Sequence, residues 1–235
     1  MSEETTTPSP DPDPAGSGGR SLALGCLGCG GLALAVVLVI VGLLVHNSWG
    51  STDYPRVGSQ EMAGRAFRYS QEAYDVMGFT RPVRPGAEPD GAGTEDTFSA
   101  DYCYDGGPLG LEDKTVDGAY RLYHSWALDH VPASQALPGL RRLHQRLTDE
   151  GWQISSYRAG GKGEDAELHA QRDGGDEWMS FDWYADRQYF SGGAGVPCAY
   201  DPAWTGSDAG PYDPGSAAGS VTPPVLRAGN GSGRG

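Results

Sequence analysis

Hydrophobic and polar residues follow four successive patterns along the chain. Residues 1–20 carry almost no apolar side chains, whereas residues 22–45 form an apolar run without a single charge. Over residues 54–200 the two kinds of residue alternate at helical and strand periods, and residues 201–235 are dominated by glycine, serine, alanine and proline. The first and last segments can bury too little apolar surface to repay the entropy of ordering. We therefore expect one folded domain over 54–200, between a disordered head and a disordered tail.

The apolar run predicts a single transmembrane helix. Its 24 residues, Leu22 to Val45, contain no Asp, Glu, Lys or Arg. A helix of this length extends about 36 Å, enough to cross a hydrocarbon core of about 30 Å. No small-x-small cleavage site follows the run at the distance that a secretory signal requires, so an uncleaved signal-anchor is expected. The lipid bilayer is thus the first partner that the sequence predicts.

Two segments have the three- and four-residue spacing of amphipathic helices. The first covers residues 58–77 and ends at Gly78, and the second covers residues 136–150, where leucines recur at 137, 140, 143 and 147. Prolines and glycines in residues 80–97 predict a loop between the first helix and the strands.

The remaining segments of the domain alternate with the two-residue period of strands. Strands are expected at 98–104, 118–129, 152–157, 166–170 and 177–185, and residues 187–191 could add a short edge strand. Short glycine-rich turns join the last strands, and such turns connect antiparallel neighbours. The predicted fold is α+β, an antiparallel sheet of four to five strands with one or two helices packed on one face.

Cysteine usage bears on the compartment. Cys103 and Cys198 bracket the domain, and a disulfide between them is the simplest interpretation, with two independent buried thiols as the alternative. A disulfide needs an oxidising compartment, whereas the arginines flanking the apolar run do not decide the orientation. We therefore expect a cytoplasmic amino terminus and a domain outside the cell membrane. Cys26 and Cys29 lie inside the apolar run, where we interpret them as small residues on the surface of the helix at the membrane edge.

Charge and motifs exclude several classes of activity. Asp and Glu outnumber Lys and Arg by 31 to 17, which gives a net charge of −14, and so acidic a chain is a poor partner for nucleic acid. The chain has no G-x-S-x-G elbow, phosphate-binding loop or H-E-x-x-H helix, and its five histidines are scattered. We expect no catalytic residue, metal or cofactor, and an extracytoplasmic hydrolase is the least favoured of three functional hypotheses.

Aromatic residues provide the best candidate for a binding surface. Trp178 and Tyr184 fall on the strand face opposite Met179, Phe181 and Trp183, and Asp182 lies between them. Flat rings beside a carboxylate could stack on cell-wall sugars or hold another envelope protein, although half-exposed aromatics can also simply pack under loops. The first hypothesis is therefore a non-enzymatic interaction or sensor domain. The second is an accessory subunit of a membrane complex that is recognised through its anchor and first helix.

A longer stretch of sequence resembles a group of known proteins. The segment LPGLRRLHQRLTDEGWQISSYRAGGKGEDAELHAQRDG is followed by WMSFDWY and PCAY. Over residues 98–200 this resembles the small membrane-anchored or lipid-anchored extracytoplasmic proteins of G+C-rich Gram-positive bacteria. In those proteins a leucine helix runs through Gly-Trp into a meander that ends near Pro-Cys. The resemblance implies an extracytoplasmic location and the same fold, and it implies no activity.

Overall fold

The computed structural model describes residues 36–42, 53–88, 93–105, 114–161, 163–206 and 210–228. The chain divides into two compact units, Met1–Trp49 and Gly50–Gly235. In the first unit, residues 36–42 form a helix. No helix within the described ranges is both long and apolar enough to cross a membrane. The predicted head at 1–20 and most of the predicted span at 22–45 lie outside the described residues.

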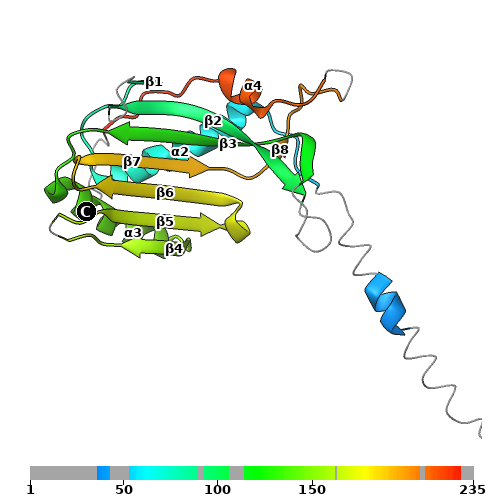
Figure 1. Ribbon diagram of the computed structural model, residues 1–235, viewed down its shortest axis with the longest axis horizontal. Helices are drawn as coiled ribbons and strands as arrows, with labels where there is room; N and C mark the ends of the chain where they lie inside the picture. Colours follow the sequence, from blue (N-terminus) through cyan, green and yellow to red (C-terminus); the bar gives the residue numbers. More distant parts are fainter. Residues whose placement is uncertain are drawn as a thin grey trace, which may run out of the picture. The chain divides into compact units, whose positions relative to one another are not determined.

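The second unit is built on one antiparallel sheet, so the predicted α+β class is confirmed, although the strand number is not. The sheet has eight strands instead of four to five, in the order β1-β2-β3-β7-β6-β5-β4, with β8 also paired to β3 (Figure 1). The strands are β1 (Gly86–Ala87), β2 (Glu95–Asp105), β3 (Lys114–Leu128), β4 (Gln153–Arg158), β5 (Ala166–Arg172), β6 (Glu177–Tyr184), β7 (Tyr189–Gly195) and β8 (Ala199–Tyr200).

The last long strand occupies a place that the sequence pattern did not predict. β7 is not a short edge strand, because it lies in the middle of the sheet between β3 and β6. Its glycines take part in the packing of the core. A Cβ on Gly192 would lie 2.4 Å from Cζ2 of Trp126 and 2.9 Å from Cδ1 of Phe181. The rings of the neighbouring strands therefore fill the space that a β7 side chain would otherwise take.

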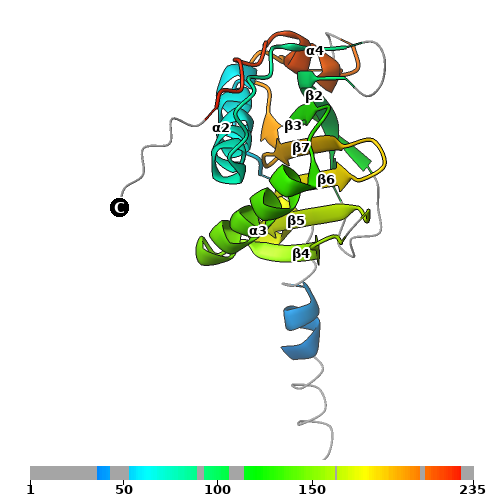
Figure 2. The same ribbon diagram turned by 90° about the vertical axis from the view of Figure 1, so that its left-hand side faces the viewer.

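Two long helices cover one face of the sheet, and no described helix of this unit lies on the other face, which we call the helix-free face (Figure 2). They are α2 (Ser59–Met77) and α3 (Ala133–Asp149), close to the ranges that the leucine and alanine spacing predicted. Gly78 ends α2 in the left-handed region at φ 75°, where its N–H reaches the carbonyl oxygens of Tyr74 and Asp75. Arg142 of α3 donates to the carbonyl oxygens of Val76 and Met77, so the two helices are joined at this end.

The segment after residue 200 corrects the prediction of a disordered tail. Residues 201–206 and 210–228 pack on the domain and include a short helix, α4 (Pro214–Gly219). Leu226 is completely buried, and its backbone pairs with that of Val83. A few well-spaced apolar residues, here Tyr212 and Leu226, are enough to anchor a chain that is otherwise rich in glycine and proline. The predicted loop over 80–97 likewise contains β1 and the start of β2.

Candidate functional site

The three residues of the predicted binding surface share one outward row of β6. Trp178, Asp182 and Tyr184 are half-buried and lie on the helix-free face, while Met179, Phe181 and Trp183 are buried beneath the helices. Trp178 and Tyr184 are six positions apart along the strand, a distance of about 20 Å. The structure therefore joins Trp178 and Asp182 in one hollow. It places Tyr184 apart, under the guanidinium of Arg187 at 4.7 Å from its ring centre.

A hollow of about 250 Å³ lies on the helix-free face above β7. We call it the glycine hollow. Backbone from Gly192 and Gly193 forms its floor. Gly193 pairs with the outward residues Ser125 and Ser180 and has no side chain to fill the hollow. Its walls come from β2, β3, β6 and β7, and the lining residues are Glu95, Ser125, Trp126, Trp178, Ser180, Asp182, Ser191, Gly192 and Gly193.

The indole of Trp178 lies against the sheet because the residue beneath it, Gly195, has no side chain. A Cβ on Gly195 would lie 2.2 Å from the indole Nε1 of Trp178 and 2.4 Å from Cε2. The indole thus rests on the backbone of β7, and Gly195 is the direct cross-strand partner of Trp178. The ring of Tyr123 from β3 lies beside it, with the ring centres 6.1 Å apart. The backbone at Gly195 and the ring of Tyr123 thus fix the orientation of the indole. The remaining surface of the Trp178 ring lines the hollows.

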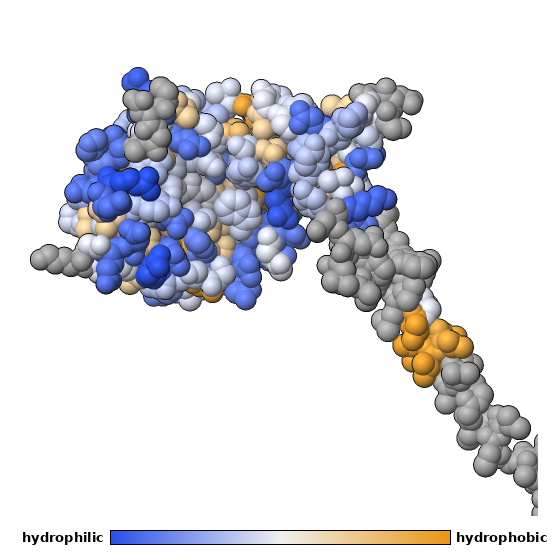
Figure 3. Space-filling model, viewed as in Figure 1, coloured by the Kyte–Doolittle hydropathy of each residue, from blue (hydrophilic) through white to orange (hydrophobic). Residues whose placement is uncertain are grey.

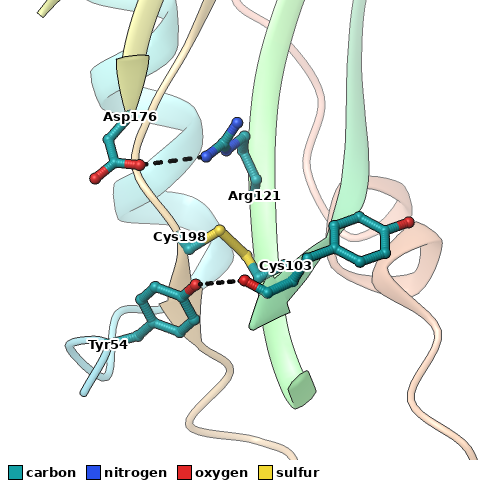
Figure 4. Close-up of a disulfide and its surroundings, with 6 residues drawn as sticks. Tyr54, Cys103, Arg121, Asp176 and Cys198 are labelled. Atoms are coloured by element: carbon teal, nitrogen blue, oxygen red, sulfur yellow. Dashed lines mark hydrogen bonds and ion pairs between the residues drawn. A yellow bond between two sulfur atoms is a disulfide. The ribbon is translucent and has the colours of Figure 1, made fainter. Parts of the chain in front are cut away.

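A second hollow, of about 570 Å³, begins on the other side of Trp178. We call it the disulfide hollow, because the Cys103–Cys198 pair forms part of its wall (Figure 4). Arg121 and Asp176 form an ion pair across its rim, with Nη2 and Oδ1 3.5 Å apart. Its lining residues are Tyr54, Asp101, Tyr102, Cys103, Tyr104, Arg121, Tyr123, Asp176, Trp178 and Cys198.

The disulfide confirms the predicted pairing of the two cysteines. It joins β2 to the residue just before β8, with the Cα atoms 6.1 Å apart and a sequence separation of 95 residues. Both cysteines are buried beside Ala119 of β3. Next to the bond, the hydroxyl of Tyr54 donates to the carbonyl oxygen of Tyr104 at 3.4 Å (Figure 4). This corner of the sheet is thus covalently fixed.

Carboxylates dominate the electrostatics of the glycine hollow. Glu95 and Asp182 line it, and no Lys or Arg is found among the described lining residues. Asp182 accepts hydrogen bonds from Ser180 Oγ at 3.2 Å and from His169 Nε2 at 3.4 Å. Burial, together with the nearby Glu95 carboxylate, raises the pKa of Tyr189 on the adjacent β7. The glycine hollow therefore has a negative electrostatic potential.

The surface around both hollows is polar. Figure 3 views the helix-free face, and the coloured part of this face carries no broad hydrophobic patch. On β5, a hydrogen bond from Ser156 and the charges of Arg158 and His169 lower the pKa of Glu167. Such a face suits a polar ligand with limited apolar area.

His124 is a buried residue of the core. Its Nε2 lies 2.7 Å from Oδ1 of Asp96, and both side chains are completely buried between β2, β3 and α2. The rings of Phe67 and Phe98 enclose the imidazole, with ring centres 5.2 and 5.1 Å away. The pair lines neither hollow of the helix-free face.

Sequence reasoning missed most of the residues that surround Trp178. Glu95, Ser125, Ser191 and Gly195 come from three strands that are far apart in the sequence. The glycine run Gly192–Gly193 was the one available signal. Within the part of the chain that the structure describes, no group of three or more His, Cys, Asp or Glu residues could hold a metal ion. No protein-family model matches the chain, and no curated protein matches it.

Proposed function

We propose that this chain is a single-pass membrane protein whose domain faces the cell envelope and binds a ligand there without catalysing a reaction. The observation that carries the proposal is the meeting of two hollows at Trp178 on the helix-free face. A fixed aromatic ring between two open hollows, lined by carboxylates, hydroxyls and further rings, is suited to holding an extended molecule across the sheet. Cell-wall material and another envelope protein are the two kinds of partner considered.

The location rests on the two features that predicted it. The 24-residue uncharged run would anchor the chain in the bilayer, with the amino terminus in the cytoplasm. A disulfide of 95-residue separation is typical of a domain that matures in an oxidising compartment. Both features favour a domain held outside the cell membrane.

The arrangement of polar groups argues against a serine hydrolase. A serine triad requires a histidine between the serine and the carboxylate, so that the imidazole can take the hydroxyl proton. On β6 the order is different, because Asp182 lies between Ser180 and His169 and accepts from both. Of the other described histidine–carboxylate pairs, His124–Asp96 is completely buried and cannot reach a substrate. In the exposed pair His130–Asp129, the carboxylate is also bound by Arg81.

The accessory-subunit hypothesis draws less support from the geometry. It requires the helix at 58–77 to be available for recognition. In the structure α2 buries seven of its residues against the sheet and α3, namely Met62, Ala63, Ala66, Ser70, Ala73, Tyr74 and Met77. The helix-free face is therefore the better candidate.

A retention assay on envelope material tests the proposal. The full chain, solubilised from membranes, is mixed with purified cell-wall sacculi and with membrane extract, and the bound fraction is measured. Trp178→Ala should lower retention about tenfold, because an aromatic stacking partner is lost. Tyr157→Ala is the matched control, since Tyr157 is a half-buried ring on β4 that stacks on His144 of α3. Equal retention of wild type and Trp178→Ala would exclude this face as the binding surface.

A further inference from the structure

The chemistry of the two hollows narrows the ligand to one class. We propose that they bind a glycan chain of neutral or amino sugars, with one pyranose ring stacked on Trp178 above the glycine hollow. The inference rests on the proposed function, since it names the ligand of the same face. It is carried by the fixed indole, the polar lining and the sign of the charge.

The indole provides the flat apolar surface that a sugar ring needs. A pyranose has one or two faces of C–H groups, while its hydroxyls point outward near the ring plane. An aromatic ring that is already immobilised can cover such a face with little further loss of entropy. Trp178 meets this condition because Gly195 supports it from below and Tyr123 from the side.

The walls of the glycine hollow offer partners for the hydroxyls. Carboxylates from Glu95 and Asp182 can each accept from neighbouring hydroxyls, and the serines at 125, 180 and 191 can donate or accept. None of the described residues lining either hollow is aliphatic. A bound peptide would need apolar pockets for its side chains, whereas hydroxyls, carboxylates and aromatic rings are the groups that bind sugars.

The charge selects among glycans. Glu95 and Asp182 in one hollow, with Asp101 and Asp176 in the other, outnumber Arg121, the one cationic group among the described lining residues. This field repels polyanionic glycans, tolerates neutral ones and attracts protonated amino sugars. The disulfide hollow, on the far side of Trp178, can hold the next units of the chain.

Titration calorimetry on the full chain in detergent tests the inference with four probes. They are a neutral N-acetylglucosamine tetramer, its deacetylated cationic form, an oligogalacturonate and an arginine-rich peptide. We expect binding of the first two, none of the polyanion, and weaker binding of the peptide, which the acidic lining attracts but which has no face of C–H groups to stack on Trp178. Trp178→Ala should weaken glycan binding about tenfold, and Trp178→Phe should weaken it less because part of the stacking area remains.

A second variant, Gly195→Ala, tests whether the position of the Trp178 ring matters as well as its presence. Gly195→Ala keeps the tryptophan, but its new Cβ would occupy the indole position and displace the ring. It should therefore weaken binding about as much as Trp178→Ala. Gly219→Ala is the matched control, since nothing lies within 4 Å of a Cβ there. Circular dichroism establishes that each variant is folded.

The outcomes distinguish the inference from the function on which it rests. The glycan assignment is overturned if neither oligosaccharide binds. It is also overturned if Trp178→Ala and Gly195→Ala leave glycan binding unchanged. Binding of the basic peptide alone also overturns it. In those cases, loss of retention by Trp178→Ala in the sacculus and membrane assay would still uphold the binding face. Unchanged retention of Trp178→Ala in that assay would contradict both the binding face and the glycan assignment.

Discussion

Removing the disulfide should cost the domain a large part of its stability. The bond closes a loop of 95 residues between β2 and the residue before β8, so it restricts the unfolded chain far more than the folded one. Loop-closure entropy for this length corresponds to about 4–5 kcal/mol in the free energy of unfolding. For a domain of this size that loss lowers the melting temperature by about 8–20 °C. The double substitution Cys103→Ser with Cys198→Ser avoids leaving an unpaired thiol.

Thermal and urea unfolding of the purified full chain measure this loss, with tryptophan fluorescence as the signal. Reductant should shift the wild-type midpoint toward that of the double variant and leave the double variant unchanged. The urea dependence should steepen in the double variant, because its unfolded state is less compact. Recovery of both cysteines as free alkylated thiols from unreduced protein would refute the reasoning. A reductant shift below about 2 °C would do the same.

Three further substitutions test the core that supports the candidate site. Asp96→Ala should lower the free energy of unfolding by at least about 1–3 kcal/mol in urea titrations, because His124 loses its buried partner. Gly192→Ala should cost about 1–3 kcal/mol or more in the same assay, since its Cβ would overlap the Trp126 ring, while Gly219→Ala stays within about 0.5 kcal/mol. Leu226→Ala should cost about 2–5 kcal/mol and speed hydrogen exchange over residues 210–228, whereas unchanged exchange there would contradict the anchoring.

The helices could be predicted because their signal is local. The three- and four-residue spacing of apolar side chains in α2 and α3 depends only on the helix itself. The first and last residues of each helix lie within three residues of the predicted ones. The segment after residue 200 was mispredicted for the opposite reason. Its composition is that of a disordered tail, and its order depends on the fit of Tyr212 and Leu226 into sites formed by residues far away in the sequence.

The candidate site could be predicted only in part, for a similar reason. Alternation along β6 places Trp178 and Asp182 on one outward row without any knowledge of neighbouring strands. The hollows depend on which strands lie beside β6. Glu95, Ser125 and Ser191 line the same hollow as Asp182 only because β2, β3, β7 and β6 lie side by side in that order.

Glycine in β7 explains both the mispredicted strand and the candidate site. The second half of β7 consists of four consecutive glycine or alanine residues, Gly192 to Gly195, and lacks the β-branched and aromatic residues by which central strands are recognised. In this sheet the missing side chains are replaced from both sides, by Trp126 and Phe181 beneath Gly192 and by Trp178 above Gly195. The same absence opens the glycine hollow and supports the indole that divides it from the disulfide hollow. Substitutions in β7 should therefore affect stability at Gly192 and ligand binding at Gly195, two effects that the assays above measure separately.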